Sequence, residues 1–417
     1  MKSNSSDILI IGGGVIGVCC AHYLTEAGAR VTLIERGDIA AGSSYGNAGL
    51  YVPSHSLPLA APGALRAGLR WMLDPESPFY VRPRLALDLW AWMLRFALAS
   101  REGPMRRAIP ILRDLSVASG VLLQELAALE GFAFGYERRG LLTVFRSTQG
   151  LEHGAREASL LREFGLRAEV VDAGRARELE PALREEVLGG VYFRDDAHMD
   201  PAKFVRGLAE RLAGHGLRIY TGTQVLDFST DGKRIVSVQT AQGEFRADQV
   251  VLAAGAWTPA VARDLRLNIP LQGAKGYSLT FPRPENGPSL PLMLGEARVA
   301  VTPMADRLRF AGTLELAGLD FSINQRRVHA IARAGREYLR VEQVGPAETW
   351  AGLRPCTPDG LPILGRTRRY ENLILATGHA MLGMALGPVS GQLVAQLAEG
   401  LQPDIDLEPL RLERFGG

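Results

Sequence analysis

Cysteine is scarce in this chain, which has three in 417 residues: the adjacent pair Cys19 and Cys20, and the isolated Cys356. So few cysteines argue against a disulfide scaffold. There is also no Cys-x-x-Cys pair and no Cys/His spacing typical of a zinc site. We therefore expect a reducing, cytoplasmic compartment, no bound metal, and buried, chemically inert roles for Cys19 and Cys20.

Long apolar runs and a large excess of one charge are also missing. No stretch reaches the ~18 uninterrupted apolar residues of a membrane-spanning helix, and the polar residues 1–6 do not have the pattern of a signal peptide. The chain has 47 Lys plus Arg against 45 Asp plus Glu, so a general nucleic-acid binder is not expected. The composition is that of a globular protein, and the length favours two or three domains.

Glycine, in contrast, is abundant, with 47 residues against a usual share of about 7%. Gly12, Gly14 and Gly17 match the pattern G-x-G-x-x-G. They follow an apolar strand at 7–11, open a helix, and precede a second strand at 29–35 that ends in an acid. In such a βαβ unit the glycines let the backbone approach a pyrophosphate at the helix N-terminus. The sequence therefore predicts dinucleotide binding.

The rest of the chain alternates strand-like and helical segments. Residues 58–130 are mostly helical, with prolines 75, 78, 83, 104 and 110 as expected breaks. Within them, 85–98 form an amphipathic helix that we expect to pack inward, the alternative being a surface for a partner or a membrane. The remaining predicted elements are strands at 141–145, 189–193, 216–225, 249–254 and 373–376, a hairpin of 234–240 with 244–247, and helices after Asp200-Pro201, over 323–342 and over 388–399.

Four motifs carry a family resemblance that covers nearly the whole chain. They are Asp7–Gly17 continuing to Thr32–Arg36, the S-x-x-NAG loop Ser43–Gly49, the segment Lys275–Thr280 (KGYSLT), and Trp350–Gly365 followed by Ala376–Gly383. By these motifs the chain resembles the D-amino-acid oxidase superfamily of FAD-dependent enzymes. Within it, the chain is most similar to bacterial D-amino acid dehydrogenases, with glycine oxidases and sarcosine oxidases as relatives.

The resemblance implies an α/β fold of two interleaved domains. A Rossmann-like FAD-binding domain of the glutathione-reductase type would comprise 1–55, 198–265 and 346–417. A substrate-binding domain, built on a large mixed or antiparallel sheet with helices, would comprise 56–197 and 266–345.

The same resemblance implies the FAD contacts. Glu35 would hold the adenosine ribose with Arg36 beside it, and Ser43 and Ser44 would touch the pyrophosphate. Ala48 to Leu50 would lie along the isoalloxazine ring, and the backbone of Val225 would meet the adenine. The full set is Gly12, Gly14, Val15, Ile16, Gly17, Glu35, Arg36, Ser43, Ser44, Asn47, Ala48, Gly49, Leu50, Val225, Ala254, Gly255, Trp257, Gly378, His379, Met381, Leu382, Gly383 and Met384.

Elementary electrostatics supports one of these contacts. A helix that begins just after Gly383 and Gly387 would direct its free N–H groups at the flavin, where reduction places negative charge. Cys356 is out of register with the flavin-linking cysteine of monomeric sarcosine oxidases, so we expect non-covalent FAD.

Arg354, in the segment Gly352-Leu-Arg-Pro355, is the predicted substrate-binding and catalytic residue. A planar guanidinium pairs with a carboxylate through two hydrogen bonds, and glycine oxidases use the matching arginine in this way. Tyr277 could supply a hydroxyl or a wall, or could be a packing aromatic. Leu50 and His55 complete the predicted pocket, although surface exposure is the favoured interpretation for His55.

Two departures from glycine oxidases suggest an apolar pocket and a bulkier substrate than glycine. Met381 replaces a second arginine, and an aliphatic residue near Val299 replaces a tyrosine.

The implied reaction is hydride transfer from Cα of a D-amino acid to flavin N5, followed by hydrolysis of the imine to a 2-oxo acid and ammonia. The sequence does not decide whether a quinone, another acceptor or O2 takes the electrons. It also leaves open an oligomer and peripheral association with the inner face of the membrane. The alternatives are an enzyme for glycine, sarcosine or cyclic imino acids such as D-proline, a non-catalytic FAD-binding subunit, and an NAD-linked dehydrogenase.

Overall fold

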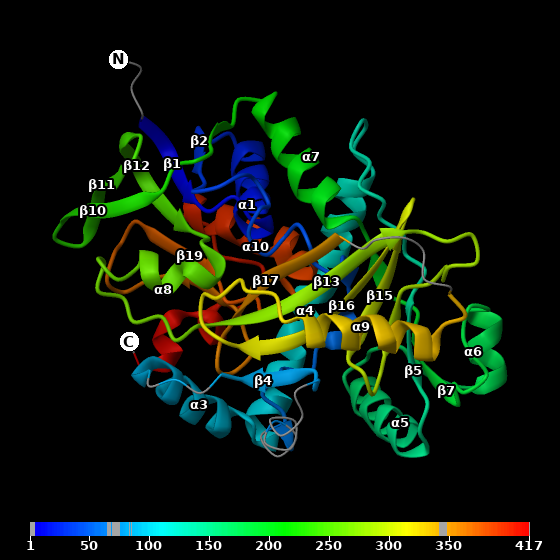
Figure 1. Ribbon diagram of the computed structural model, residues 1–417. Coiled ribbons are helices and arrows are strands. Elements are labelled where there is room, and N and C mark those ends of the chain that lie inside the picture. The colour runs from blue at the N-terminus through cyan, green and yellow to red at the C-terminus, as the bar shows by residue number, and fades with distance from the viewer. Residues whose placement is uncertain are drawn as a thin grey trace.

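Two large sheets organise the computed structural model, which describes residues 5–64, 68, 76–82, 84, 86–341 and 348–416 (Figure 1). One sheet has eight strands and the other has nine. Helices pack on both, and segments from each third of the chain contribute to the first sheet. The predicted α/β class with a second, mixed sheet is confirmed.

The first sheet is centred on β1 (Ser5–Ile11). On one side β1 pairs in parallel with β2 (Val31–Ile34), and β2 pairs with β9 (Arg218–Tyr220). On the other side it pairs in parallel with β12 (Gly243–Leu252), and β12 pairs with β19 (Leu373–Thr377). Every side chain of β2 and β19 is buried, as expected where helices cover both faces of a parallel sheet. The sheet is completed by β10 (Val225–Asp231), β11 (Arg234–Thr240) and β18 (Ile363–Arg366).

Two predicted segments of this sheet have different bounds. The predicted strands 244–247 and 249–254 are one strand, β12, whose first part closes the hairpin with β11 and whose second part joins β1. The segment 216–225 contains β9 and only the first residue of β10. Pairing partners, rather than local sequence, decide where these strands begin and end.

The second sheet has the strand order β17-β13-β16-β15-β14-β5-β7-β6, with β4 added beside β16. Helix α9 (Gln325–Tyr338) lies in front of its centre (Figure 1). Strand β17 lies within the 346–417 segment that the resemblance assigns to the FAD-binding domain, yet it pairs with β13. The strands are β17 (Glu348–Cys356), β13 (Gln272–Pro282), β16 (Arg307–Leu316), β15 (Val299–Met304), β14 (Leu292–Leu294), β5 (Leu141–Phe145), β7 (Gly189–Phe193), β6 (Ala168–Asp172) and β4 (Phe79–Val81).

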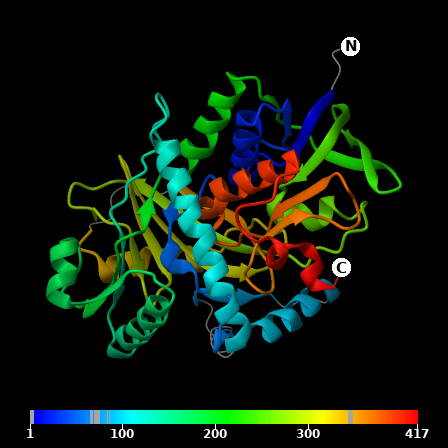
Figure 2. The ribbon, with the colours of Figure 1, turned by 180° about the vertical axis from the view of Figure 1, so that it is seen from behind.

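Proline does not break the helices where the sequence suggests. Helix α4 (Glu102–Ala127) contains Pro104 in its first turn, where the missing N–H costs no hydrogen bond, and continues through Pro110. Helix α10 (Gly383–Glu399) begins five residues before Pro388, which lies buried inside it. Prolines 75 and 83 lie outside the described residues. Seen from behind, α4 crosses the molecule and packs against α10 (Figure 2).

The remaining helices follow local signals more closely. Helix α7 (Pro201–Ala213) is capped by Asp200, whose Oδ1 accepts the N–H of Ala202 at 3.0 Å and of Lys203 at 3.2 Å, as predicted. The other described elements are α1 (Val15–Glu26), α3 (Leu87–Ala99), α5 (Thr148–Glu163), α6 (Ala173–Leu179), α8 (Thr258–Val261), the paired β3 (Leu50–Tyr51) and β8 (Ala197–His198), and short 3-10 turns at Pro53–His55, Gly255–Trp257, Glu408–Leu410 and Leu412–Phe415.

Helix α3 has two apolar faces. Leu89, Trp92 and Phe96 are buried, which confirms the expected inward packing. The opposite face exposes Trp90 by 58% and Leu94 by 64%, in line with Leu87 and Leu98. Among the described residues, no helix is both long enough and apolar enough to cross a bilayer.

Candidate functional site

The glycine-rich turn between β1 and α1 has no room for a side chain at Gly12 or Gly17. Gly12 has a φ of 119°, and a Cβ there would lie 2.5 Å from the carbonyl oxygen of Ala253. A Cβ on Gly17 would lie 1.8 Å from the carbonyl oxygen of Gly12. Both neighbours are backbone atoms that cannot move aside. The turn therefore has the bare backbone that the fingerprint predicts for a pyrophosphate site.

Two polar side chains close this turn. Glu35, directly after β2, accepts the N–H of Gly13 at 2.7 Å and of Gly37 at 2.9 Å through its two carboxylate oxygens. The hydroxyl of Ser44 accepts the N–H of Val15, the first residue of α1, at 3.0 Å. The predicted ribose acid and one predicted pyrophosphate residue thus lie at the same helix N-terminus.

A second helix N-terminus lies beside the first. Helix α10 runs parallel to α1, because Gly383 lies next to Val15, Gly387 next to Val15 and Cys19, and Gly391 next to Cys19. A Cβ on Gly391 would come within 2.5 Å of the Cys19 carbonyl oxygen. Gly383 and Gly387 are predicted to lie in the turn before the helix, but both belong to α10. Their four-residue spacing, continued by Gly391, is the sequence signal for this close packing.

The paired N-termini give this end of the first sheet a positive electrostatic character. Each helix contributes the N–H groups of its first turn, of which that of Val15 in α1 is capped by the Ser44 hydroxyl, and the positive end of its dipole. Cys19 and Cys20 lie in the core behind them, where burial raises the pKa of both thiols. Their predicted burial is confirmed. An anionic, pyrophosphate-containing cofactor fits this arrangement of bare backbone and free donors.

The loop 43–50 connects this end to the second sheet through Arg309 of β16. Its guanidinium, 1% exposed, donates from Nη1 to the carbonyl oxygens of Tyr45 at 3.0 Å and Asn47 at 2.8 Å. Burial lowers its pKa. Arg309 is not among the residues predicted from the sequence. The available signal is a charged residue between the apolar neighbours Leu308 and Phe310 of a predicted strand region.

Other residues of this loop also contact the second sheet. The Ser43 hydroxyl donates to the carbonyl oxygen of Leu353 at 2.5 Å, so its contact with a pyrophosphate stays a prediction. The Asn47 side chain accepts the N–H of Gly49 at 2.9 Å. Gly46 lies against the ring of Trp350, where a Cβ would come within 2.1 Å of the ring. Trp350, which begins the Trp350–Gly365 motif, is a second residue whose place at the site the sequence analysis does not assign.

Gly49 and Leu50 end the loop in the short pair β3–β8. Gly49 has a φ of 73°, and a Cβ there would lie 2.2 Å from the carbonyl oxygen of Met199. Leu50 is buried and pairs with His198. Ala48 and Leu50 thus lie on either side of the fixed Gly49, and their place along the flavin ring stays a prediction.

Arg354 projects from β17 on the face of the second sheet that meets this loop. Its guanidinium lies over Gly276, where a Cβ would be 2.0 Å from Nη1. Nη1 donates to the carbonyl oxygen of Thr313 at 2.6 Å. No described carboxylate forms an ion pair with Arg354, and burial lowers its pKa. The structure therefore holds an unneutralised cation beside the predicted cofactor loop.

Tyr277 lies on the opposite face of the same sheet. Gly276 points toward Arg354, so its neighbour Tyr277 points away, because successive residues of a strand alternate. The Tyr277 hydroxyl donates to Glu315 Oε2 at 2.9 Å, and burial together with this hydrogen bond raises its pKa. The structure does not bring Tyr277 and Arg354 together, and it favours the packing interpretation of Tyr277.

The predicted pocket residues are spread more widely. His55 is half-buried rather than exposed, and burial with the nearby Arg298 lowers its pKa to about 4. Met381 is exposed. Val299 packs against Gly312 beside Ile331 of α9, so it faces the core on the far side of the sheet rather than a pocket.

The last predicted contacts flank β12, β10 and β19. Ala254 and Gly255 follow β12, and the guanidinium of Arg36 stacks 4.1 Å from the ring centre of Trp257. Val225 begins β10 and is half-buried. The His379 side chain faces α10, where Nε2 pairs with Ser390 Oγ at 2.9 Å, and burial lowers its pKa to about 3.

Residues Gly378 to Met384 connect β19 to the start of α10. A Cβ on Gly378, whose φ is 78°, would lie 2.7 Å from Thr357. The His379 ring points into the core, so of the predicted contacts in this connection the backbone and the exposed Met381 side chain remain available to a cofactor. The N–H groups of this connection directly precede the N-terminus of α10.

Comparisons with known proteins agree with this geometry. Residues 7–397 match the family model described as "DAO: FAD dependent oxidoreductase". A D-amino acid dehydrogenase of Granulibacter bethesdensis is 35% identical over 98% of this chain and 100% of that protein. Another, of Paramagnetospirillum magneticum, is 38% identical over 98% of each chain. The crystal structure of glycine oxidase from Geobacillus kaustophilus superposes with a TM-score of 0.78 at 25% identity, covering 98% of this chain and 99% of that one.

Proposed function

Since the chain belongs to the family of FAD-dependent oxidoreductases called DAO, we propose that it oxidises D-amino acids to 2-oxo acids and ammonia. The relatives named D-amino acid dehydrogenase support this substrate class. The observation that carries the proposal is the unneutralised guanidinium of Arg354 beside the cofactor loop. A substrate carboxylate would neutralise it.

The cofactor would be held mainly by backbone. Glu35 and Ser44 would meet the adenosine and pyrophosphate parts, and the N-termini of α1 and α10 would stabilise negative charge. The loop 43–50, tied down by Arg309, would lie along the ring. When bound, FAD supplies the acceptor for the two electrons and the hydrogen removed from the substrate Cα.

Arg354 would orient the substrate. A bidentate pair with the carboxylate fixes both the position and the rotation of the α-carbon, which converts binding energy into alignment of the reacting bond. Among the described residues the Thr313 carbonyl is the one acceptor for the Arg354 guanidinium, so its other donors are available for this pair. The absence of a second arginine at Met381 supports larger, hydrophobic side chains over glycine.

An anaerobic reduction screen tests the proposal. D-Alanine, D-phenylalanine and D-leucine should bleach the yellow flavin absorbance, and the L-enantiomers should do so more slowly or not at all. Arg354→Ala should keep FAD but weaken apparent substrate affinity by at least about 30-fold, since it removes a charged partner from a desolvated site. Arg175→Ala, at an exposed arginine, is the matched control. Normal substrate affinity in Arg354→Ala would refute the carboxylate assignment.

The glycine oxidase structural neighbour supports a second candidate, the oxidation of glycine, sarcosine or cyclic imino acids. The same screen separates the two. Turnover of sarcosine or D-proline without turnover of D-alanine, D-phenylalanine or D-leucine would favour this candidate. A flavin that no amine reduces would favour the non-catalytic FAD-binding subunit.

We also propose that the outer face of α3 contacts a membrane surface, as suits a dehydrogenase that passes electrons to a quinone. Leu87, Trp90, Leu94 and Leu98 form one apolar stripe at helical spacing, and Trp90 suits the level of the lipid headgroups. Arg101, which is exposed and follows the C-terminal end of α3, would attract anionic lipid.

Vesicle flotation tests this surface. The protein should float with vesicles containing anionic phospholipid and less with neutral ones, and a double change of Trp90→Ser and Leu94→Ser should abolish flotation without affecting FAD content. Val117→Ser with Val121→Ser, at exposed positions of α4, is the matched control. Equal flotation of the α3 variant and the parent would exclude α3 as the contact.

A further inference from the structure

The strand that supplies the Thr313 carbonyl has a bulge at that point. In the pairing of β13 with β16, Lys275 lies opposite Glu315 and Tyr277 lies opposite Gly312. Two residues of β16, Thr313 and Leu314, therefore stand opposite Gly276 alone. Thr313 has a φ of 67°, a left-handed conformation that a β-branched residue rarely adopts. Such a conformation persists only where surrounding contacts enforce it.

The bulge determines where the Arg354 guanidinium lies. The carbonyl oxygen of Thr313 accepts Nη1 at 2.6 Å, and Gly276 opposite the bulge leaves the space that the guanidinium occupies. A regular ladder would place the Thr313 carbonyl in a cross-strand hydrogen bond. Arg354 would then lose its only protein acceptor among the described residues.

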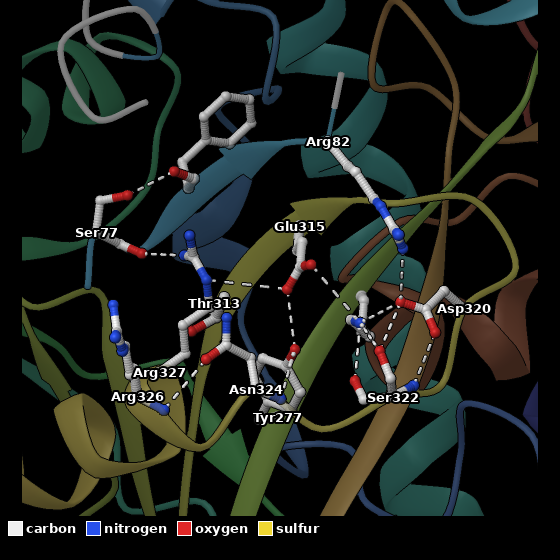
Figure 3. A network of polar contacts seen from close by, with 12 residues as sticks. Ser77, Arg82, Tyr277, Thr313, Glu315, Asp320, Ser322, Asn324, Arg326 and Arg327 are labelled. Carbon is white, nitrogen blue, oxygen red and sulfur yellow. Dashed lines mark hydrogen bonds and ion pairs between the residues drawn. The ribbon is translucent and has the colours of Figure 1, made fainter. Parts of the chain in front are cut away.

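A buried polar cluster on the other face of the sheet holds the bulge (Figure 3). Its centre is Glu315, the first residue after the bulge that pairs with β13 again. Glu315 accepts the Tyr277 hydroxyl at 2.9 Å and forms ion pairs with Lys275 at 3.6 Å and Arg327 at 3.9 Å. All four side chains are buried. A carboxylate held this way in the interior cannot shift by one register position without leaving buried charges unpaired.

The partners of Glu315 are themselves fixed to other elements. Lys275 Nζ contacts Asp320 at 3.0 Å and donates to the Ser322 carbonyl at 2.8 Å. Arg327 of α9 donates to the Ser77 carbonyl at 2.6 Å. Within the bulge, the N–H of Leu314 donates to the Pro78 carbonyl at 2.7 Å, where β4 joins the sheet. The cluster therefore ties the end of β16 to α9, to β4 and to the 317–324 connection.

We propose that Tyr277 and Lys275, acting through Glu315, are positioning residues for Arg354. They enforce the bulge that directs the Thr313 carbonyl at Nη1 and thereby orient the free donors toward the substrate carboxylate. This inference rests on the proposed carboxylate-binding role of Arg354. It gives Tyr277 a role at the site without contact with substrate or cofactor.

Tyr277→Phe tests the proposal with the holoenzyme, because it removes only the hydroxyl. Benzoate, a carboxylate that needs no turnover, serves as the probe, and its dissociation constant is read from the shift in the flavin spectrum. We expect a weakening of roughly 5- to 20-fold. The FAD content should change much less. The matched control is Tyr338→Phe, which removes a buried hydroxyl bonded to Glu296 at 2.5 Å on the same side of the sheet.

Two further variants separate positioning from a general loss of packing. In an Arg354→Lys background, Tyr277→Phe should weaken benzoate binding by less than about twofold, because the orientation it protects is already lost. Thr313→Gly removes the conformational penalty at φ 67°. Combined with Tyr277→Phe, it should restore most of the lost affinity.

The outcomes distinguish the two proposals. If Arg354→Ala weakens benzoate binding and Tyr277→Phe does not, the positioning role is refuted and the proposed function stands. If Tyr277→Phe lowers the melting temperature alone, or weakens benzoate binding equally in the Arg354→Lys background, the hydroxyl is merely structural. If Arg354→Ala leaves benzoate binding unchanged, the proposed carboxylate site itself fails.

Discussion

The two sheets meet the candidate site with different parts of the chain. The first sheet presents backbone: bare glycines and the N–H groups at the starts of α1 and α10. The mixed sheet presents side chains, above all Arg309, Trp350 and Arg354. A Cβ added at Gly12, Gly17 or Gly391 would meet backbone atoms, whereas one added at Gly46 or Gly276 would meet a side chain. Tolerance to substitution should therefore differ between the two sheets, because side chains can repack and backbone cannot.

The largest expected effect is at the glycine-rich turn. Gly17→Ala should lose FAD and at least about 3 kcal/mol of stability, because its Cβ would lie 1.8 Å from the Gly12 carbonyl oxygen. The ratio of flavin to protein absorbance and a thermal melt would show it. Gly103→Ala, in the first turn of α4 with its nearest neighbour at 3.6 Å, should behave as the parent. A flavin-loaded, stable Gly17→Ala protein would contradict the contrast between the sheets.

Arg309→Met would show whether the cofactor loop depends on a side chain of the second sheet. This side chain belongs to the mixed sheet but supports the cofactor loop, and its loss leaves the carbonyl groups of Tyr45 and Asn47 without their donor. Unsatisfied carbonyls cost about 1–3 kcal/mol each, so FAD affinity should fall by at least tenfold in a fluorescence titration. Arg326→Met, at an exposed residue of α9, should leave it unchanged. Unaltered FAD affinity in Arg309→Met would mean that the loop needs no support from the second sheet.

Gly46→Ala tests the same contrast between the two sheets, with an intermediate expected loss of stability. Its Cβ would lie 2.1 Å from the Trp350 ring, so we expect a loss of about 1–3 kcal/mol and weaker FAD binding. Adding Trp350→Ala should restore much of both, since the obstacle is a side chain. The same second change should do nothing for Gly17→Ala. Failure of Trp350→Ala to rescue Gly46→Ala would show that the loop backbone is as rigid as the glycine-rich turn.

The smallest effect concerns acid stability. Burial lowers the pKa of His379 to about 3, so this group is neutral when folded but protonates in the unfolded chain below about pH 6.5. Stability is therefore lost as the pH falls from about 6.5 toward 3. His379→Gln keeps a donor for Ser390 and does not titrate, so it should match the parent at pH 7.5 and lose about 1.4 kcal/mol less at pH 5.5. Denaturant titrations of both proteins at both pH values would measure this difference in stability. Equal losses of stability in His379→Gln and the parent would refute the lowered pKa of His379.

The sequence predicts the first sheet better than the second for a physical reason. The fingerprint around Gly12 to Gly17 is local, because strand, turn and helix are consecutive. Arg354 is predictable because it lies in a motif. Arg309 and Trp350 cannot be assigned to the site from the sequence. Their role becomes visible only when the strand register shows that they share one face of the sheet. The hydroxyl of Tyr277 points away from Arg354 because successive residues of a strand alternate between faces. The bulge at Thr313, which positions the carbonyl that Arg354 contacts, has no sequence signature of its own.

Helix α3 and helix α10 show two further limits. Apolar spacing alone does not tell which of two apolar faces of α3 packs inward, since both satisfy a helical period. Pro388 resembles a helix start, but the earlier turn of α10 is stabilised by close contact of its glycines with α1. Tertiary contacts decide both cases.

The parallel packing of α1 against α10 has a consequence for biogenesis. The first helix of the chain reaches its partner only after residue 383 has been synthesised, and β1 obtains β12 and β19 only after residues 243 and 373. At about 5–20 residues per second, the nascent glycine-rich turn waits roughly 20 to 80 seconds before the cofactor site can close. During translation this apolar strand and helix need protection from aggregation, and FAD can be loaded only onto an almost finished chain.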